Sequence, residues 1–377
     1  MKAVFITSTF DHYHLPSCEE AYRQLGSDFT FISTIPMPES MKKLGFTDFS
    51  KIRPYALNAW ENEENKQKAK DLCDNADMVI IGAASEKFVE KRLKENKLTF
   101  CFSERLFKKG VKSFFKPKNA IGLYKKHIQF RNNSNYYILC SGYYAAKDFR
   151  IIGMNPGKLL RWGYFSAVKE LKREFNNDVV TLLWTGRFVE LKHPEYAIEV
   201  AKELKRENVD FRMKFIGMGP MQEQMQSYID SNNLGDNVKI LGSMPTEEVQ
   251  KHMDNADIAL FTSDRREGWG AVVNEAMVGG CAVVASSAAG CSKSLINNGI
   301  NGFVYHHPNK KEFIQYVMKL VKDKDLRERI GVQANKDLCE KWNGTEGMKR
   351  LLDLSRAVVE GGILPEYEDG PCSVAKD

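Results

Sequence analysis

Short apolar runs alternate with longer amphipathic stretches along the first half of the chain. Each run is bounded by polar or turn-forming residues. Continuous apolar runs are typical of parallel strands, which are buried on both faces because the connecting helices cover the sheet. We therefore predict strands at residues 2–8, 29–33, 78–82, 98–102 and 137–141, with a further run at 158–165.

A second series of runs follows with the same alternation. Amphipathic helical patterns lie between and after these runs, at 194–207, 220–232, 310–323 and 326–339. A repeated β-then-α order predicts a doubly wound parallel sheet, so two series predict two Rossmann-like α/β domains. The strands predicted for the second series are 179–186, 211–217, 238–242, 258–262, 281–286 and 302–305.

Breaks in this pattern predict the domain boundaries. A first domain spans residues 1–165 and a second spans 179–341, joined by a charged linker at 166–178. A last amphipathic pattern covers 342–359, and the tail at 361–377, rich in Gly, Pro and acidic residues, is expected to be mobile. Ligands of doubly wound sheets bind beyond the carboxyl ends of the strands, so two facing sheets would form a cleft there.

The composition fits two globular domains. The chain has 377 residues, of which 43% are hydrophobic and 28% charged, and this excludes a disordered protein. No apolar run approaches the ~18 residues of a transmembrane helix, and the first run is too short for a signal-peptide core. The eight cysteines form no CxxC pair. Reduced, buried thiols in a cytoplasmic protein are expected, rather than disulfides or structural zinc.

Positive charge is concentrated in one segment. The net charge is only +6, but residues 105–131 contain nine Lys or Arg and no Asp or Glu, with Phe and Tyr between them. A solvated basic surface is one interpretation. The other is a surface that docks on anionic lipid or on a phosphate-bearing acceptor. Nucleic acid is not an expected partner, because no known DNA- or RNA-binding motif accompanies the segment.

Two loops that follow strands in the second half carry candidate phosphate-binding residues. In TGRFVELKHP, Gly186 ends a strand, and Arg187 and Lys192 follow, five positions apart. Arg can fork onto phosphate oxygens and Lys is a point charge, so the pair suits a diphosphate; an ordinary exposed pair is the alternative. In FIGMGP, Gly217 and Gly219 either make a tight turn or cradle a phosphate, although the GxGxxG pattern is absent.

The stretch DRREGWGAVVNE, residues 264–275, places a glutamate on each side of a predicted helix start near Gly270. The amides of a first helical turn have no internal partners and attract anions, and Gly268 and Gly270 would let a phosphate come close. Glu275 follows about one turn later among apolar residues, where a charge is costly unless it accepts hydrogen bonds. A ribose diol would supply two donors. Backbone amides or a lysine are the alternative.

The spacing of Glu267 and Glu275 separates two kinds of enzyme. Eight residues of helix would place them ~12 Å apart, whereas the two carboxylates of a glycosidase lie ~5–5.5 Å or ~6.5–9.5 Å apart. The spacing therefore favours two carboxylates that contact opposite ends of one extended ligand. A nucleotide-sugar has this shape, with the diphosphate in the middle.

Together, these motifs resemble those of family 4 glycosyltransferases. Glu267 and Glu275 match the family's E-x7-E motif, and TGRFVELK resembles its G-R-x4-K diphosphate clamp. The runs FIGMGP, VKILGSMP and ADIALFTS follow at matching spacing. The resemblance covers residues 179–335 strongly and the first half more weakly. It implies a GT-B fold whose last helix returns to the first domain, a nucleotide-sugar donor, retention of anomeric configuration, and no required metal or other cofactor.

The resemblance also implies roles for individual residues. Arg187 and Lys192 would hold the diphosphate, and Glu267 would contact sugar hydroxyls, so these three form the predicted catalytic group. Glu275 would accept hydrogen bonds from ribose. Further donor contacts would come from loop residues and backbone amides, including a loop that flanks the base: Gly186, Gly242, Ser243, Met244, Gly268, Trp269, Gly270 and Ala271.

The first half departs from the family's pattern. TSTFDHYHLP replaces a common Gly-Gly loop after the first strand, and Ser103-Glu104 follows a middle strand where a His is common. His12 and His14 resemble a histidine pair in a polysaccharide-biosynthesis branch, so we place His12, His14 and Glu104 on the acceptor side. A metal site at the His-x-His is not expected, because further ligands are lacking nearby. Beyond the E-x7-E helix, AAGCSKS replaces a common Gly-Gly-x-Pro-Glu run.

The expected function is metal-independent, retaining transfer of a hexosyl group from an NDP-sugar to a hydroxyl of a bacterial-type glycan or lipid-linked glycan, in cell-surface polysaccharide synthesis. The expected location is the cytoplasm, at the inner face of the plasma membrane if the basic segment binds lipid. Two alternatives stay open. One is a GT-B epimerase that acts on nucleotide-sugars, and the other is a catalytically silent scaffold of a glycan-assembly complex.

Overall fold

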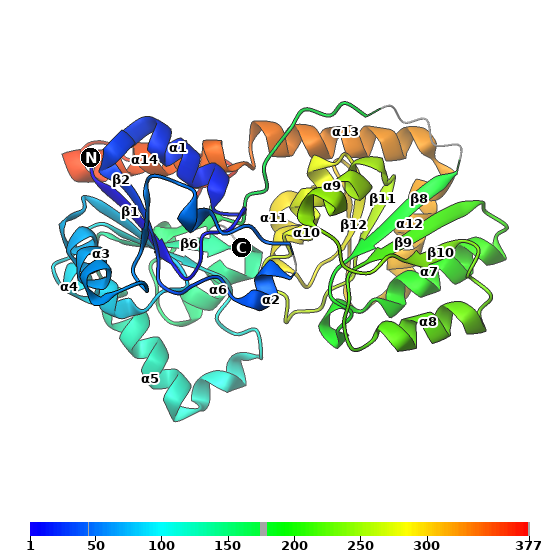
Figure 1. Cartoon of the computed structure of the whole chain (residues 1–377), viewed down its shortest axis with the longest axis horizontal. Helices are drawn as coiled ribbons and strands as arrows, with labels where there is room; N and C mark the ends of the chain where they lie inside the picture. Colours follow the sequence, from blue (N-terminus) through cyan, green and yellow to red (C-terminus); the bar gives the residue numbers. More distant parts are fainter. Residues whose placement is uncertain (44, 174–178, 376–377) are drawn as a thin grey trace. The chain divides into compact units, whose positions relative to one another are not determined.

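The chain divides into two compact units, Met1–Ala167 together with Lys341–Asp377, and Val168–Glu340 (Figure 1). Among the described residues, each unit contains one sheet in which every strand pairing is parallel, with seven strands in the first and six in the second. The two parallel α/β units predicted from the apolar runs are therefore present. The computed structural model describes residues 1–43, 45–173 and 179–375.

The sheet of the first unit has the strand order β3-β2-β1-β4-β5-β6-β7. β3 was not predicted, because it has three residues of which only one is buried. The strands are β1 (Ala3–Thr7), β2 (Phe29–Ser33), β3 (Ala56–Asn58), β4 (Met78–Ile81), β5 (Thr99–Ser103), β6 (Tyr136–Ser141) and β7 (Leu159–Trp162). The helices are α1 (Leu15–Leu25), α2 (Glu39–Lys42), α3 (Glu63–Asn75), α4 (Glu90–Lys94), α5 (Pro117–Lys126), α6 (Tyr143–Ile151) and α14 (Gly344–Glu360).

A buried cation joins α4 to the core of this unit. Arg92 is 0% exposed, and its guanidinium donates to the carbonyl oxygens of Cys73, Ala76 and Leu98 and to Thr99 Oγ1. Burial lowers the pKa of Arg92 to about 10. A buried charge is tolerated when strong hydrogen bonds replace water, and this arginine meets that condition.

The last helix packs against α1, and the two lie side by side in Figure 1. Asn343 caps the start of α14: its side-chain oxygen accepts a hydrogen bond of 2.8 Å from the amide of Glu346. This amide of the first turn has no partner within the helix itself. Gly344 lets the helix approach α1 closely, because a Cβ there would lie 2.6 Å from Pro16.

The expectation of a mobile tail is wrong for residues 370–375. The amides of Cys372 and Ala375 donate to the carbonyls of Arg161 and Leu159 at 2.9 and 2.8 Å, and Arg161 donates back to Ser373 at 2.8 Å. β7 is the edge strand of the sheet, so its free backbone groups offer a template for this antiparallel segment. Residues 376–377 of the predicted tail lie outside the described residues.

The sheet of the second unit has the order β10-β9-β8-β11-β12-β13. Leu182 of β8 lies opposite Met213 on one side and Ile258 on the other, and all three are 0% exposed. The strands are β8 (Val180–Thr185), β9 (Phe211–Ile216), β10 (Val238–Ile240), β11 (Ile258–Phe261), β12 (Ala282–Ser286) and β13 (Phe303–Tyr305). The helices are α7 (Glu195–Arg206), α8 (Gln222–Ser231), α9 (Thr246–Asn255), α10 (Val272–Val278), α11 (Gly290–Leu295), α12 (Lys310–Lys322) and α13 (Lys324–Glu340).

The described part of the predicted linker packs on the second unit. Leu171 packs closely on Gly280, where a Cβ would lie 2.6 Å from the Leu171 side chain. Arg173 forms a buried ion pair with Asp257. Residues 168–173 are thus part of this unit rather than an extended connection. The predicted linker residues 174–178 lie outside the described residues. No helix within the described ranges is both long enough and apolar enough to cross a membrane.

Candidate active site

The candidate site of the second unit lies at the point where the strand order reverses. β8 pairs with β9 on one side and with β11 on the other, so the chain winds outward in both directions from β8. Ligands of doubly wound sheets bind at this switch point, beyond the carboxyl ends of the strands. The loops after β8 and β11 carry Arg187, Lys192 and Glu267, so the fold brings these predicted residues to one edge of the sheet.

Two glycines of FIGMGP let the loop after β9 pack against the loop after β8. Gly217 has φ +133°, and a Cβ there would lie 1.9 Å from the Gly186 carbonyl oxygen. At Gly219, with φ +157°, a Cβ would lie 2.6 Å from the Phe188 carbonyl oxygen. Hydrogen bonds of 3.0 Å join the two loops, from Gly186 to Ile216 and from Phe188 to Met218. Close backbone packing between the two loops therefore accounts for both glycines.

Lys192 forms an ion pair with Glu267, and the two side chains are only 14% and 17% exposed. The Lys192 carbonyl oxygen accepts a hydrogen bond of 2.5 Å from Thr262 Oγ1, which itself accepts from Trp184 Nε1 at 2.9 Å. The Lys192 ammonium also lies 5.8 Å from the centre of the Phe261 ring. Buried residues at the ends of both strands therefore fix the backbone of Lys192.

Arg187 differs from Lys192 in having an exposed side chain. It follows Gly186 directly at the end of β8, and none of the described carboxylates forms an ion pair with it. A guanidinium at a strand end retains five donors for an incoming anion. The sequence motif therefore places one cation that is already paired and one that faces solvent.

The loop that carries Glu267 is held from two sides. Its amide donates to the Asp264 carbonyl at 3.0 Å, and the carbonyls of Gly268 and Trp269 accept from the first amides of α11 at 3.1 Å. Gly270 has φ +97°, and a Cβ there would lie 2.5 Å from the Phe261 ring. Glycine at this position is thus required by packing on β11, independent of any ligand.

Glu275 lies in α10 as predicted, but the helix begins at Val272 rather than Gly270. Every residue from 273 to 278 is buried, which confirms the interpretation of an apolar helix packed on nearly every side. Glu275 is 9% exposed, and Trp269 donates to the neighbouring Asn274 at 2.8 Å. Ala271 directly precedes the helix and is partly exposed.

The predicted base-flanking loop, Gly242, Ser243 and Met244, follows β10 at the same edge. The Gly217 amide donates to the Gly242 carbonyl at 2.8 Å, so this loop joins the row of loops after β8 and β9. Gly242 has φ +78°, and nothing would lie within 4 Å of a Cβ there. The positive φ therefore favours glycine at position 242, whereas packing would leave room for a side chain.

A cluster of ionisable side chains beside Lys192 was not predicted. His193 adopts φ +47°, and its ring contacts Glu195 at 2.8 Å through Nδ1 and Asp264 at 3.5 Å through Nε2. The hydrogen bond to Glu195 raises the pKa of His193, and burial opposes that rise only in part. His193 and Glu195 follow the G-R-x4-K motif in the sequence, and Asp264 precedes Glu267. No local sequence pattern indicates that these side chains are in contact.

In the first unit, the predicted His14 forms a pair with Asp11 in the loop after β1. His14 Nδ1 lies 2.8 Å from Asp11 Oδ1, and both residues are buried. Burial disfavours the Asp11 carboxylate, but the charge and hydrogen bond of His14, together with His12 and the Tyr13 amide, outweigh burial and hold the pKa of Asp11 below its usual value. His12 is partly exposed and its ring lies 4.0 Å from that of Tyr13. Asp11 was missed although it stands within the quoted loop.

Glu104 follows β5 of the first unit and forms an ion pair with Lys108. The same segment is anchored by Asp148, which is 3% exposed and accepts the amide of Phe107 at 2.9 Å. Burial raises the pKa of Asp148, although Arg105 at 3.6 Å and the Phe107 amide oppose the rise. The start of the basic segment is therefore fixed to α6.

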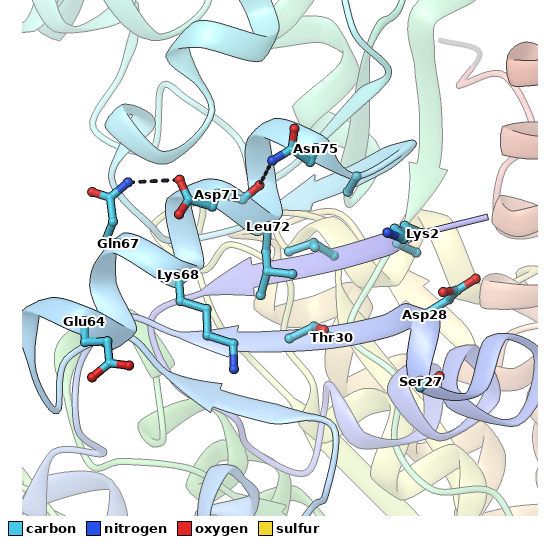
Figure 2. A pocket seen from close by; sticks show the side chains of 13 residues that line it. Lys2, Ser27, Asp28, Thr30, Glu64, Gln67, Lys68, Asp71, Leu72 and Asn75 are labelled. Carbon is cyan, nitrogen blue, oxygen red and sulfur yellow. Dashed lines mark hydrogen bonds between the residues drawn. The ribbon is translucent and has the colours of Figure 1, made fainter.

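A groove of about 720 Å³ lies elsewhere in the first unit, between α3 and the first two strands. Figure 2 shows Lys68 and Leu72 extending from α3 toward the strand that carries Thr30, with Lys2 and Asp28 at the starts of β1 and β2. This is the amino end of the strands, so the groove is separate from the loop that carries His14. Among the described residues no group of three or more His, Cys, Asp or Glu is arranged to hold a metal ion.

Comparison with known proteins relates the second unit to a family. Residues 168–337 match the family model described as glycosyl transferases group 1. Alpha-D-kanosaminyltransferase of Streptomyces kanamyceticus is 31% identical over 166 residues, which cover 44% of this chain and 42% of that protein. The amylovoran biosynthesis glycosyltransferase AmsK of Erwinia amylovora is 31% identical over 137 residues, 35% of this chain and 33% of that protein. The matched part of the chain thus spans less than half of these relatives.

Solved structures resemble the chain over nearly its whole length. HepE from Anabaena, solved in complex with UDP, has a TM-score of 0.68 at 14% identity and covers 93% of this chain and 99% of its own. TarM has a TM-score of 0.69 at 13% identity, with 94% and 99% covered. At this identity the likeness shows the fold, and it confirms the predicted GT-B class.

Residues 168–337 therefore resemble the glycosyl transferases group 1 family, and this match covers less than half of the chain. This match confirms the family resemblance found in the sequence motifs. The matched range lies in the second unit, which contains Arg187, Lys192, Glu267 and Glu275.

Proposed function

We propose that this protein is a glycosyltransferase that moves a sugar from an NDP-sugar to a hydroxyl of a glycan or lipid-linked glycan in polysaccharide synthesis. One observation carries the proposal. The switch point of a domain that resembles group 1 glycosyltransferases has two cations, Arg187 and Lys192, on the loop after β8 and a carboxylate, Glu267, on the loop after β11. Similarity to an alpha-D-kanosaminyltransferase and to an amylovoran biosynthesis glycosyltransferase supports the class of reaction.

The geometry suits a diphosphate leaving group. In the proposed reaction, the bond between the anomeric carbon and the diphosphate breaks while the acceptor hydroxyl forms the new glycosidic bond and gives its proton to the departing diphosphate. Negative charge then grows on the diphosphate, where Arg187 donates from solvent and Lys192 from its buried position. Fixed charges of this kind stabilise a leaving group without reorganisation, so two cations can serve in place of a metal.

Glu267 and Glu275 bind the two ends of the donor in this proposal. Glu267 accepts from sugar hydroxyls while it keeps Lys192 in place, and the buried Glu275 accepts from ribose. The loop residues Gly186, Gly242, Ser243, Met244, Gly268, Trp269, Gly270 and Ala271 supply the remaining donor contacts. We further propose retention of configuration and an acceptor bound near His12, His14 and Glu104 of the first unit.

Donor turnover tests these assignments. UDP-sugars are the first donors to try, because HepE was solved with UDP-glucose as well as UDP. We expect Arg187→Ala and Glu275→Ala to slow NDP release by about 10²–10³-fold, the usual cost of losing one preorganised charge contact. Arg265→Ala is the matched control, since Arg265 is exposed on the loop that carries Glu267. Unchanged turnover in Arg187→Ala and Glu275→Ala would remove the assignment.

We also propose that the basic segment docks the protein on the inner, anionic face of the plasma membrane. No residue of α5 is buried, and Val111, Ile121 and Tyr124 are 44%, 56% and 55% exposed. Lysines surround them, and segment 105–131 lacks carboxylates, which is the composition of an interfacial helix.

Co-sedimentation with phosphatidylserine vesicles tests the membrane proposal. Each lysine near an anionic surface contributes about 1 kcal/mol, so changing Lys112, Lys116 and Lys118 to Gln should weaken binding about 100-fold. The control changes three lysines of α3 to Gln in the same unit, namely Lys66, Lys68 and Lys70. Equal binding of the two triple variants would show that the basic segment is an ordinary solvated surface.

A further inference from the structure

His193 closes a ring of contacts around the Lys192–Glu267 pair. It is covalently next to Lys192, and its Nε2 lies 3.5 Å from Asp264 Oδ2. The Asp264 carbonyl accepts the amide of Glu267 at 3.0 Å, and Glu267 returns to Lys192 through the ion pair. The Asp264 amide also donates to the carbonyl of Leu191 at 2.8 Å. The loops after β8 and β11 are therefore joined by backbone at one point and by the imidazole at another.

The imidazole joins two carboxylates, of which Asp264 is also bound by Arg266 at 2.7 Å. Glu195 Oε1 contacts His193 Nδ1 at 2.8 Å, and Glu195 Oε2 is buried without a hydrogen-bond partner among the described residues. Burial disfavours both carboxylates, but His193 lowers the pKa of Glu195, and Arg266 with His193 lowers that of Asp264. Doubly protonated His193 can donate to both carboxylates at once, whereas a neutral ring can donate to only one.

The neighbouring ring of His307 is compatible with a charged His193. His307 lies 5.2 Å away, and burial followed by the charge of His193 lowers the pKa of His307, so it stays neutral when His193 is charged. Tyr196 and Lys310 also lie close, the lysine 4.6 Å from the tyrosine ring. The titratable and charged groups that face His193 or its two carboxylates are Lys192, Glu195, Tyr196, Asp264, Arg266, His307 and Lys310.

We propose that protonated His193 is a positioning residue, which holds Lys192 and Glu267 in the geometry that binds a nucleotide diphosphate. This rests on the proposed function and adds a pH dependence to it. Because the folded state favours the charged imidazole, the effect is complete below the ordinary pKa of histidine and is lost as pH rises through the higher folded-state value. Loss of the proton leaves the imidazole with one N–H for two carboxylates, so it releases Glu195 or Asp264 and loosens the contact that it makes between the loops.

Calorimetric titration with UDP across about pH 6 to 9 tests the proposal. The variant is His193→Asn, because Asn tolerates the left-handed backbone but carries no charge. The control is His306→Asn in the same unit, where the side chain is 85% exposed. UDP itself titrates in this range, so the quantity compared is the ratio of wild-type to variant affinity, in which the titration of UDP cancels.

We expect His193→Asn to bind UDP about tenfold more weakly than wild type near pH 6 and about equally near pH 9, as proton linkage requires. His306→Asn should follow wild type. Glu195→Gln should move the wild-type transition to lower pH, which a purely structural role of His193 would not do. A ratio that is constant with pH, or a transition that Glu195→Gln leaves in place, overturns the proposal. If wild type binds none of UDP, GDP, ADP and dTDP, the proposed function itself is overturned, and this inference with it; if it binds one of the others, the same comparison is made with that nucleotide.

Discussion

Gly217→Ala is the substitution whose effect the structure defines most closely. A Cβ at this position would lie 1.9 Å from the Gly186 carbonyl oxygen, where contacts below 3.0 Å are essentially never seen. The loop after β8 must therefore move by about 1 Å, and it is the loop that carries Arg187 and Lys192. Crowding of this kind costs about 1–3 kcal/mol, and the unusual φ of +133° adds about 1–3 kcal/mol.

We therefore expect Gly217→Ala to lower the free energy of unfolding by about 2–6 kcal/mol. Donor turnover should fall by about 100-fold, because a 1 Å shift of a binding group is enough for that loss. Substitutions at two other glycines of the same unit serve as controls, which separate crowding from backbone strain. Gly299 has φ +80° but its nearest Cβ contact is an ordinary 3.8 Å, and Gly235 has neither strain nor any neighbour within 4 Å.

The assay is denaturant unfolding followed by circular dichroism, together with NDP release from the best donor. Gly299→Ala should lose about 1–2 kcal/mol from backbone strain alone, and Gly235→Ala should change stability by less than about 1 kcal/mol. Neither control should alter turnover beyond its effect on stability. If Gly217→Ala is no less stable than Gly299→Ala and turns over donor at the wild-type rate, the close approach of the two loops does not position the site.

Three further predictions concern buried polar groups. Arg92→Met should lower the free energy of unfolding by about 3–5 kcal/mol, because it leaves buried carbonyls without donors; denaturant unfolding measures this, and a loss below 1 kcal/mol would contradict it. Thr262→Val should lower both stability, by about 2–4 kcal/mol, and donor turnover, because the Trp184 indole and the Lys192 carbonyl lose their partner; wild-type turnover would contradict it. Burial disfavours the Asp369 carboxylate. Its interactions with Lys341 and Arg161 outweigh burial and lower the pKa of Asp369 to about 2. Its contribution should be present above pH 3.8 and lost as pH falls toward about 2, and an Asp369→Asn variant should show a smaller loss of stability on acidification in thermal unfolding.

The apolar runs predicted the fold because parallel strands leave a strong local pattern. Of the thirteen strands among the described residues, ten fall within predicted runs and two, β5 and β6, extend one residue beyond theirs. Only β3, with one buried residue, was missed. The segment 370–375 was assigned wrongly because its pairing depends on β7, about two hundred positions earlier. Amino-acid composition alone does not predict that a polar C-terminal segment will pair with an edge strand far away in the sequence.

The site was predictable where its residues are close in sequence. Arg187 and Lys192 stand out as cations after a strand, and Glu275 as a carboxylate in an apolar helix. The contact of Lys192 with Glu267 depends on β8 and β11 being neighbours, which the strand sequence order does not reveal. His193 and Asp264 were missed for the same reason, and the left-handed backbone that turns the imidazole toward both carboxylates has no signature in a non-glycine residue.

A crystal structure of the protein with UDP tests the central claim most directly. The account predicts that the diphosphate lies at the carboxyl ends of β8 and β11, within hydrogen-bond distance of Arg187 and Lys192, with the ribose hydroxyls on Glu275. Nucleotide bound elsewhere on the second unit, with Arg187 still in solvent and Glu275 out of contact, would contradict it.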